Sequence, residues 1–299
     1  MEKRNLDSNA AGAHLADALS IRRRLVSHCG LKDRHAVTRQ WFSAHLPGQD
    51  SPKPSALETD NLRILRVTRN TRKLRRGTHI GNRFTIQLRQ PEFPFKQAVK
   101  RWQAITMQGV PNIFGPQRFG YQGNNVTKAL AMFAGDFETR DRLLRGLLIS
   151  AARSHLFNTM VAERTTRALW DSPLEGEVYG ITSNRSLILP DRQRGDERQR
   201  FAQGLIEITA PLWGTGKLQS TQEVRLLEQE IASHYPKLTV GLEACGLKQE
   251  RRVIRLRPES PSLEAHSNGD IQCTFTLPKG TYATSLLREL AILSNNDQT

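Results

Sequence analysis

One carboxylate stands between two cationic side chains in the turn Lys32-Asp33-Arg34. The turn follows a short apolar run from Val26 to Cys29, and functional loops are often presented at the end of such a strand. Neighbouring cations favour the ionised form of a carboxylate, which is the form that acts as a nucleophile. A Lys-Asp-Arg turn taken alone is more often a solvated surface turn, so its context must decide between the two interpretations.

A second dense block lies far downstream and reads Gly109-Val-Pro-Asn-Ile-Phe-Gly-Pro-Gln-Arg-Phe-Gly120. Its glycines and prolines fix a tight backbone whatever the function, so a purely structural role is its simplest interpretation.

Other kinds of catalytic site have no support in the sequence. The cysteines Cys29, Cys245 and Cys273 are far apart and form no CxxC pair, which favours a reducing compartment over a disulfide or zinc framework. The histidines show neither HxH nor HExxH spacing, and no GxGxxG, GxxxxGK or GxSxG motif occurs. We therefore expect neither a metal nor a small-molecule cofactor.

The chain is strongly basic, with a formal net charge of +15 and a pI near 10.4. Such an excess attracts polyanions, so nucleic acid is the first expected partner and an anionic membrane surface the second. No stretch has the apolar length that a membrane span needs, and the N-terminus has no apolar secretory region. We expect a cytoplasmic protein. The densest basic cluster is expected to contact RNA phosphates without reading sequence, and it consists of Arg69, Arg72, Lys73, Arg75 and Arg76.

Hydrophobic periodicity predicts strands near both ends of the chain and helices in the middle. Helices are expected over 8–21 (with Ser8 as the cap), 95–105, 128–133, 140–153, 156–169, 197–206, 223–235 and 284–293. Strands are expected over 26–29, 36–46, 62–67, 84–88, 252–256 and 271–277, with a polar loop over 258–270. This order predicts an α+β fold with a domain inserted into a discontinuous one.

Five segments resemble the TruD family of tRNA pseudouridine synthases, and they occur in the family's order. They are GLKDRHAVT from Gly30, RNTRKLRRGTHIGNRF from Arg69, the block from Gly109, SAARSHLFN from Ser150 and PLWG from Pro211. The resemblance implies a pseudouridine-synthase catalytic domain with a mixed, largely antiparallel sheet, formed by 1–107 plus 257–299. A mostly helical TRUD domain, 108–256, would interrupt it.

The same resemblance implies a role for individual residues. Asp33 would be the single catalytic aspartate. Tyr282 stands where the family more often has Phe, and it keeps an aromatic face while adding a hydroxyl. The substrate-binding residues would be Lys32, Asn82, Phe84, Gln117, Arg118 and Tyr282. Phe84 alone would be interpreted as a core residue of a strand.

The implied reaction is isomerisation of a uridine in tRNA, at position 13 in the D arm, by a monomer that needs no cofactor. Asp33 would attack C1′ or C6, and the sequence leaves both open. Because these atoms are inaccessible in a stacked helix, the nucleotide must be flipped out. Family members begin with further strands, and Met1 falls on the Glu-Lys-Arg that normally follows them, so the resemblance implies a chain lacking that N-terminal segment.

Two alternatives remain open at this point. The chain could be a catalytically silent RNA-binding protein or RNA chaperone that keeps the basic cleft. It could instead be a base-flipping hydrolase that uses Asp33 to cut the glycosidic bond and release free uracil. An isomerase leaves the mass of the RNA unchanged, whereas a hydrolase does not.

Overall fold

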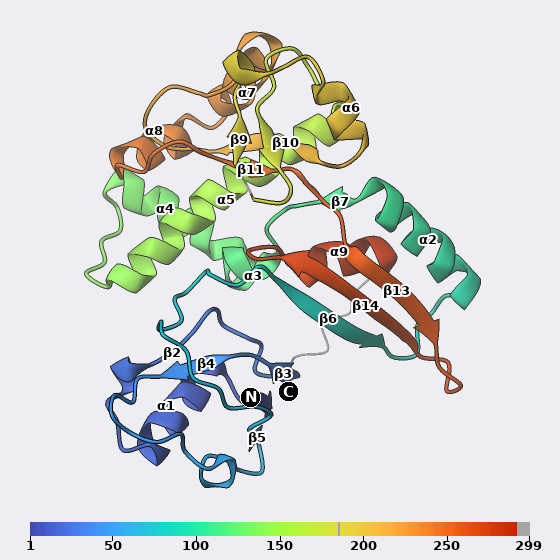
Figure 1. Cartoon of the computed structure of the whole chain (residues 1–299). Helices are drawn as coiled ribbons and strands as arrows, with labels where there is room; N and C mark the ends of the chain where they lie inside the picture. The colour runs from blue at the N-terminus through green and yellow to red at the C-terminus, as the bar shows by residue number, and fades with distance from the viewer. Residues whose placement is uncertain (185, 292–299) are drawn as a thin grey trace. The chain divides into compact units, whose positions relative to one another are not determined.

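The computed structural model describes residues 1–184 and 186–291 (Figure 1). Helices and antiparallel strand pairs make up the fold, so the α+β class expected from the sequence is confirmed. The backbone divides into two compact units, unit 1 from Met1 to Asn82 and unit 2 from Arg83 to Thr299. The expected division into 1–107 plus 257–299 and 108–256 stays a prediction.

Unit 1 is built around one helix and two small sheets. The central strand of the first sheet, which has the order β3-β1-β5, pairs antiparallel with both neighbours and sets Lys3 opposite Thr38 and Leu62. In the second sheet β2 pairs with β4. The elements are β1 (Glu2–Arg4), α1 (Ser8–Ala18), β2 (Val26–His28), β3 (Val37–Arg39), β4 (Phe42–Ala44) and β5 (Leu62–Arg63).

The N-terminus of α1 is capped by Asp7, whose carboxylate accepts from the backbone N–H groups of Asn9 (2.8 Å) and Ala10 (2.9 Å). Such a cap satisfies N–H groups that have no partner inside the helix. The sequence interpretation of Ser8 as the cap was therefore wrong by one residue. Ser8 is fully buried, and its hydroxyl binds elsewhere.

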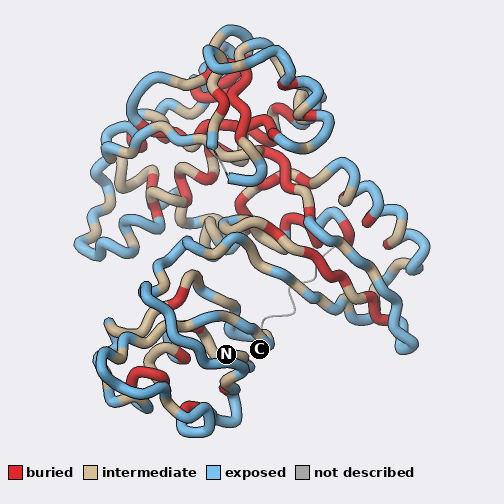
Figure 2. Tube along the Cα trace, viewed as in Figure 1, coloured by how far each residue is buried: buried red, intermediate tan, exposed pale blue. Residues whose placement is uncertain are grey.

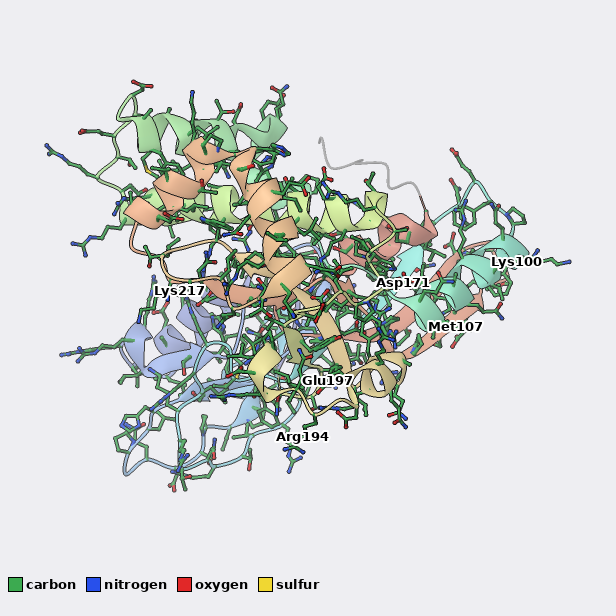
Figure 3. The ribbon with its side chains drawn as sticks, turned by 90° about the horizontal axis from the view of Figure 1, so that it is seen from above. Lys100, Met107, Asp171, Arg194, Glu197 and Lys217 are labelled. Atoms are coloured by element: carbon green, nitrogen blue, oxygen red, sulfur yellow. The ribbon has the colours of Figure 1, made fainter. Side chains whose placement is uncertain are left out.

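Unit 2 contains a three-stranded sheet of order β13-β14-β6, formed by β6 (Gly81–Leu88), β13 (Glu259–Ala265) and β14 (Ile271–Pro278). Alternate residues of β14 are buried together with side chains of α2 (Phe95–Gln108) and α9 (Ala283–Leu290). Trp102 of α2 lies against Phe275 in this core. Lys100 and Met107, labelled in Figure 3, are exposed on the opposite face of α2.

The rest of unit 2 is mostly helical and has a core of its own. A four-stranded sheet of order β11-β10-β8-β9 accompanies the helices, and every residue of β10 except the last is buried (Figure 2). The helices are α3 (Pro116–Phe119), α4 (Asn124–Ala134), α5 (Arg142–Thr166), α6 (Glu197–Ala202), α7 (Gln222–Ser233) and α8 (Pro236–Ala244). The strands are β7 (Val110–Pro111), β8 (Tyr179–Ile181), β9 (Leu187–Ile188), β10 (Ile206–Leu212), β11 (Glu250–Val253) and β12 (Arg255–Leu256).

Several expected elements of unit 1 and the following strand need correction. The single strand expected over 36–46 is two strands, because β3 pairs with β1 while β4 pairs with β2. The strand expected over 62–67 ends at Arg63, and the next backbone N–H, of Ile64, donates to the Glu58 carboxylate at 2.8 Å instead of to a neighbouring strand. The strands expected over 26–29 and 84–88 are confirmed as β2 and β6.

Corrections in unit 2 concern where helices and strands begin, break and end. The two helices expected over 140–169 are the single helix α5, and the polar loop expected over 258–270 contains β13. The helix expected over 197–206 stops at Ala202, since Gly204 adopts φ +70° before β10 begins. The strand expected over 252–256 falls into β11 and β12. The last helix, α9, ends at Leu290, and positions 292–293 of the expected range lie outside the described residues.

Candidate active site

The turn that carries Asp33 lies between β2 and β3, outside regular structure. The Asp33 side chain is exposed to solvent, as an attacking group must be if a large substrate is to reach it. Just beyond it, the backbone N–H of Ala36 donates to the carbonyl oxygen of Arg34 at 2.9 Å, which tightens the turn. The loop therefore presents one accessible carboxylate on a constrained backbone.

Lys32, the residue before Asp33, is held at both its backbone and its side chain. Its backbone N–H donates to the hydroxyl of Ser8 at 2.9 Å, and its ammonium group donates to the side-chain oxygen of Asn82. Burial lowers the pKa of Lys32, while the charge of Asp33 acts in the opposite direction. The structure thus brings together two of the predicted substrate-binding residues, Lys32 and Asn82.

A third cation near the loop, Lys3, is not among the residues that the sequence singled out. Its side chain is only 1% exposed in the central strand β1. The ammonium group donates to the carbonyl oxygen of Leu6 and to that of Asp33, the latter at 3.2 Å. Burial lowers the pKa of Lys3, and the charges of Asp7 and Asp33 oppose that shift. Nothing in the spacing of a lysine in a short strand signals such a contact.

Unit 1 carries most of the excess positive charge. Its 82 residues include 16 Lys and Arg and 7 Asp and Glu, a formal net charge of +9 out of +15 for the whole chain. The predicted phosphate-contacting residues Arg69, Arg72, Lys73, Arg75 and Arg76 are all exposed here. Two of them also fix their own segment, because Arg69 donates to the Gln49 carbonyl and Lys73 to that of Arg24.

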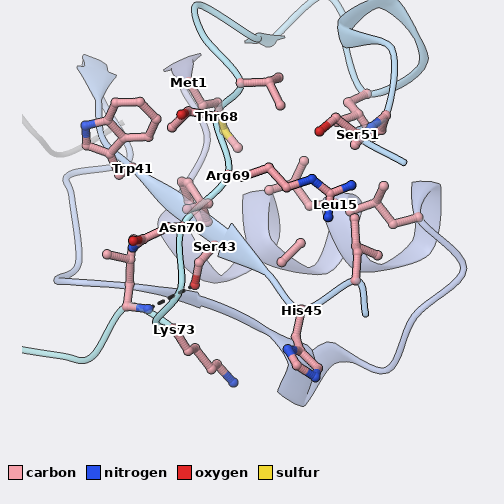
Figure 4. Close-up of a pocket in the computed structure, with 18 of the residues that line it drawn as sticks. Met1, Leu15, Trp41, Ser43, His45, Ser51, Thr68, Arg69, Asn70 and Lys73 are labelled. Carbon is pink, nitrogen blue, oxygen red and sulfur yellow. Dashed lines mark hydrogen bonds between the residues drawn. The ribbon is translucent and has the colours of Figure 1, made fainter. Parts of the chain in front are cut away.

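The basic segment borders a cavity of about 670 Å³ inside unit 1 (Figure 4). Trp41, Ser43 and His45 line it on one side, and the Ser43 hydroxyl accepts from the backbone N–H of Leu74 at 3.1 Å. Arg69 and Lys73 are also among its lining residues. Neither Asp33 nor Asn82 lines this cavity, so the cavity is not where the nucleophile is expected.

Phe84, the predicted stacking residue, lies on β6 and is half-buried. Its ring stacks on that of Phe275 of β14, with centroids 5.5 Å apart and an interplanar angle of 27°. One face is therefore supported by the core of unit 2. The structural interpretation and the substrate-stacking interpretation are compatible, because a supported ring is a rigid platform.

Arg118 and Tyr282 meet in unit 2. One nitrogen of the Arg118 guanidinium donates to the Tyr282 hydroxyl at 2.8 Å, and the other donates to the Ser150 hydroxyl of α5 at 2.8 Å. The guanidinium also lies over the ring of Phe114, 5.3 Å from its centroid. Gln117, its neighbour on α3, is exposed. A direct contact of Gln117 or Arg118 with substrate stays a prediction.

The block from Gly109 to Gly120 is tied to segments far away in sequence. Asn158 of α5 both donates to the Phe114 carbonyl (2.9 Å) and accepts from the Phe114 N–H (2.8 Å). The Asn112 amide donates to the Val253 carbonyl at 2.9 Å. Gly109 adopts φ +78°, and a side chain there would collide with the backbone of Leu256. The block therefore has a clear structural role, which does not exclude a substrate role.

Within residues 1–184 and 186–291, no group of three or more His, Cys, Asp or Glu is arranged to hold a metal ion. Over the same residues, no helix is both long enough and apolar enough to span a membrane. The expected independence from metals and cofactors stays a prediction.

Comparison with known proteins decides the family. The family model described as tRNA pseudouridine synthase D (TruD) matches residues 1–141 and 133–290. The chain belongs to the TruD family. The tRNA pseudouridine synthase D of Chromohalobacter salexigens is 40% identical over 292 residues, which cover 97% of this chain and 84% of that protein. That of Colwellia psychrerythraea is 40% identical over 295 residues, covering 95% and 79%.

A solved structure of a TruD protein from Methanosarcina mazei supports the same fold. It aligns with a TM-score of 0.76 at 19% sequence identity, covering 98% of this chain and 87% of that one. The resemblance identified from five short motifs is therefore confirmed, and so is the TruD-like α+β fold. The roles assigned to individual residues stay predictions.

Proposed function

We propose that this TruD-family chain is an isomerase that converts uridine in tRNA to pseudouridine, with Asp33 as the nucleophile. The observation that carries the proposal is the placement of Asp33. It is the exposed carboxylate of the family-matching turn, and the Lys32-Asp33 backbone is held by the side chains of Lys3 and Ser8. A nucleophile needs such positioning because small errors in attack geometry cost much of the rate.

The proposed reaction leaves the composition of the nucleotide unchanged. The Asp33 carboxylate attacks C1′ of the ribose or C6 of the uracil, and the glycosidic C1′–N1 bond breaks. The detached uracil turns within the site and its C5 forms a bond to C1′. The proton on C5 then leaves for water, N1 regains a proton, and the Asp33 carboxylate is released unchanged. The proposed reaction requires no oxidant, reductant or cofactor.

The remaining predicted residues have supporting roles in this proposal. The net charge of +9 on unit 1 supports binding of the tRNA backbone, with Arg69, Arg72 and Lys73 at its phosphates. Asn82 and Lys32, which meet in unit 1, would read the edge of the flipped base. We infer that the target is the uridine at position 13 in the D arm and that the enzyme acts as a cytoplasmic monomer.

The test is tritium release from tRNA transcribed with 5-tritiated uridine. We expect release by the unaltered chain and its loss, by at least about a thousandfold, in Asp33→Ala, because the covalent step has no substitute nucleophile. Asp60→Asn is the matched control, since Asp60 is another exposed aspartate of unit 1 and should leave the rate unchanged.

The alternatives make different predictions in the same experiment. A base-flipping hydrolase would release free uracil and leave abasic RNA, which mass spectrometry of the RNA would detect. A silent RNA-binding protein would release no tritium but would bind tRNA equally well with and without Asp33→Ala. Activity in Asp33→Ala equal to that of the unaltered chain would contradict the assignment of the nucleophile.

A further inference from the structure

Lys3 occupies an unusual position for a lysine. It lies in the middle of the central strand β1, opposite Thr38 and Leu62, and only 1% of its surface is exposed. Lysine is almost never fully buried unless its ammonium group is paired, because removing the charge from water is costly. A buried lysine of this kind therefore has to be explained by what its ammonium group contacts.

The ammonium group of Lys3 is directed at the loop of the proposed nucleophile. It donates to the backbone carbonyl of Asp33 at 3.2 Å, across 30 residues of sequence, and to the carbonyl of Leu6. A hydrogen bond from a charged donor is stronger than a neutral one. The positive charge also lies close enough to the Asp33 carboxylate for the two to interact electrostatically.

A second contact holds the same peptide segment from the other side. The backbone N–H of Lys32 donates to the hydroxyl of Ser8 at 2.9 Å, and Ser8 is fully buried in the first turn of α1. The Lys32 N–H and the Asp33 C=O are the groups at the two ends of the Lys32-Asp33 segment. The segment is therefore hydrogen-bonded at both ends to side chains of β1 and α1.

We propose that Lys3, assisted by Ser8, is a positioning residue for the reaction: it fixes the backbone from which the Asp33 carboxylate attacks. This inference rests on the proposed function, because positioning matters only if Asp33 is the nucleophile. Lys3 itself makes no contact with the reacting atoms in this proposal. It acts through the Asp33 backbone.

The experiment compares Lys3→Met with two matched variants in the full chain. Met has a similar length and lacks the charge and the donors, so Lys3→Met should lower kcat for tRNA about a hundredfold while KM stays within about threefold. Its thermal midpoint should fall by no more than a few degrees, because removal of the buried charge offsets part of the loss of the two hydrogen bonds to carbonyl oxygens. Lys53→Met, at an exposed lysine of the same unit, should change neither quantity.

Leu62→Ala separates positioning from simple structural support. Leu62 is 2% exposed and pairs with Lys3 across the sheet, so this variant should lower the thermal midpoint by several degrees and leave kcat within about threefold. A merely structural Lys3 would move stability and kcat together. If Lys3→Met does not fold, Ser8→Ala tests the other contact, with an expected fall in kcat of about tenfold at unchanged KM.

A measurement without turnover distinguishes failure of this inference from failure of the proposed function. The ¹³C chemical shift of the Asp33 backbone carbonyl reports its hydrogen bond, and it should change in Lys3→Met but not in Lys53→Met. If the unaltered chain forms no pseudouridine, the proposed function fails and the carbonyl shift still decides whether Lys3 holds the loop. An unchanged shift, or a kcat of Lys3→Met within threefold of the unaltered chain, would overturn the inference.

Discussion

The hydroxyl of Tyr282 is expected to serve the structure rather than the chemistry, and Tyr282→Phe tests this. The hydroxyl accepts from Arg118 at 2.8 Å, and a hydrogen bond from a charged donor contributes roughly 1.5–3 kcal/mol. Arg118 keeps its bond to Ser150 at 2.8 Å and its position over Phe114. Both groups are only half-buried, so water can replace part of the loss. We therefore expect Tyr282→Phe to lower the free energy of unfolding by the low end of this range, about 1.5 kcal/mol.

This free energy corresponds to a measurable shift in thermal unfolding. For a unit of this size, about 1 kcal/mol moves the midpoint by roughly 2–4 °C, so Tyr282→Phe should lower it by about 3–6 °C. A double-mutant cycle with Arg118→Met should give a coupling of similar size, about 1.5 kcal/mol, because the two side chains share the bond. Tyr121→Phe is the control: Tyr121 is 75% exposed and should show no change.

Activity provides the decisive comparison. Phe keeps the aromatic face that is expected to cover the base, so tritium release by Tyr282→Phe should stay within about threefold of the unaltered chain. A hundredfold loss of activity with an unchanged midpoint would refute this reasoning and assign the hydroxyl to the reaction. A coupling near zero in the double-mutant cycle would instead refute the importance of the bond to Arg118.

Two further predictions concern stability and RNA binding. Hydrogen bonds from the Gln90 backbone N–H, from Asn268 and from Gln87 hold the pKa of Asp270 below its usual range. A depressed folded-state pKa gives stability that is present above about pH 4 and lost as pH falls further, so Asp270→Asn should flatten the fall of the thermal midpoint below about pH 4. Arg72→Gln should weaken binding of every RNA and reduce the salt slope of log affinity by about 0.7; an unchanged slope would contradict a phosphate contact.

The sequence predicted well those elements whose hydrophobic residues recur along one face and pack with that face against a core. In α2, Ala98, Trp102 and Ile105 recur at helical spacing and form one buried face. In β14, alternation places Cys273 and Phe275 on the buried side of the sheet. Local pattern was enough in both elements because each buries one face against a single core.

Prediction failed where a local signal was overridden by tertiary structure. Ser260 and Pro261 indicate a loop, yet they lie in β13, which tolerates them because it is an edge strand with an irregular register between Glu259 and Ser262 and φ +48° at Ser260. The helices expected over 140–153 and 156–169 are continuous in α5, and Ser154, which lies between the two expected ranges, is buried within that helix.

In the candidate site, too, local sequence did not reveal contacts that depend on tertiary structure. The motif around Asp33 could be recognised from the sequence, whereas the residues that hold it could not. Ser8 was interpreted as a helix cap, but its hydroxyl accepts from the Lys32 backbone, and Lys3 gave no signal at all. Hydrogen bonds that join residues 24 to 30 positions apart depend on the fold, and no local spacing encodes them.

The second family block, from Gly109 to Gly120, also depends on contacts between segments that are far apart in sequence. β7 pairs antiparallel with β12, setting Val110 opposite Leu256 and Pro111 opposite Arg255, so the chain leaves and returns at one place. The hydrogen bond from Asn112 to the Val253 carbonyl adds to this pairing across 141 residues. Val110 is buried in the core that includes the sheet carrying Phe84, and Phe114 is buried in the mostly helical core, so a change of backbone in this block would disturb the packing of both. The block therefore has a structural reason for its sequence whether or not Gln117 and Arg118 contact substrate.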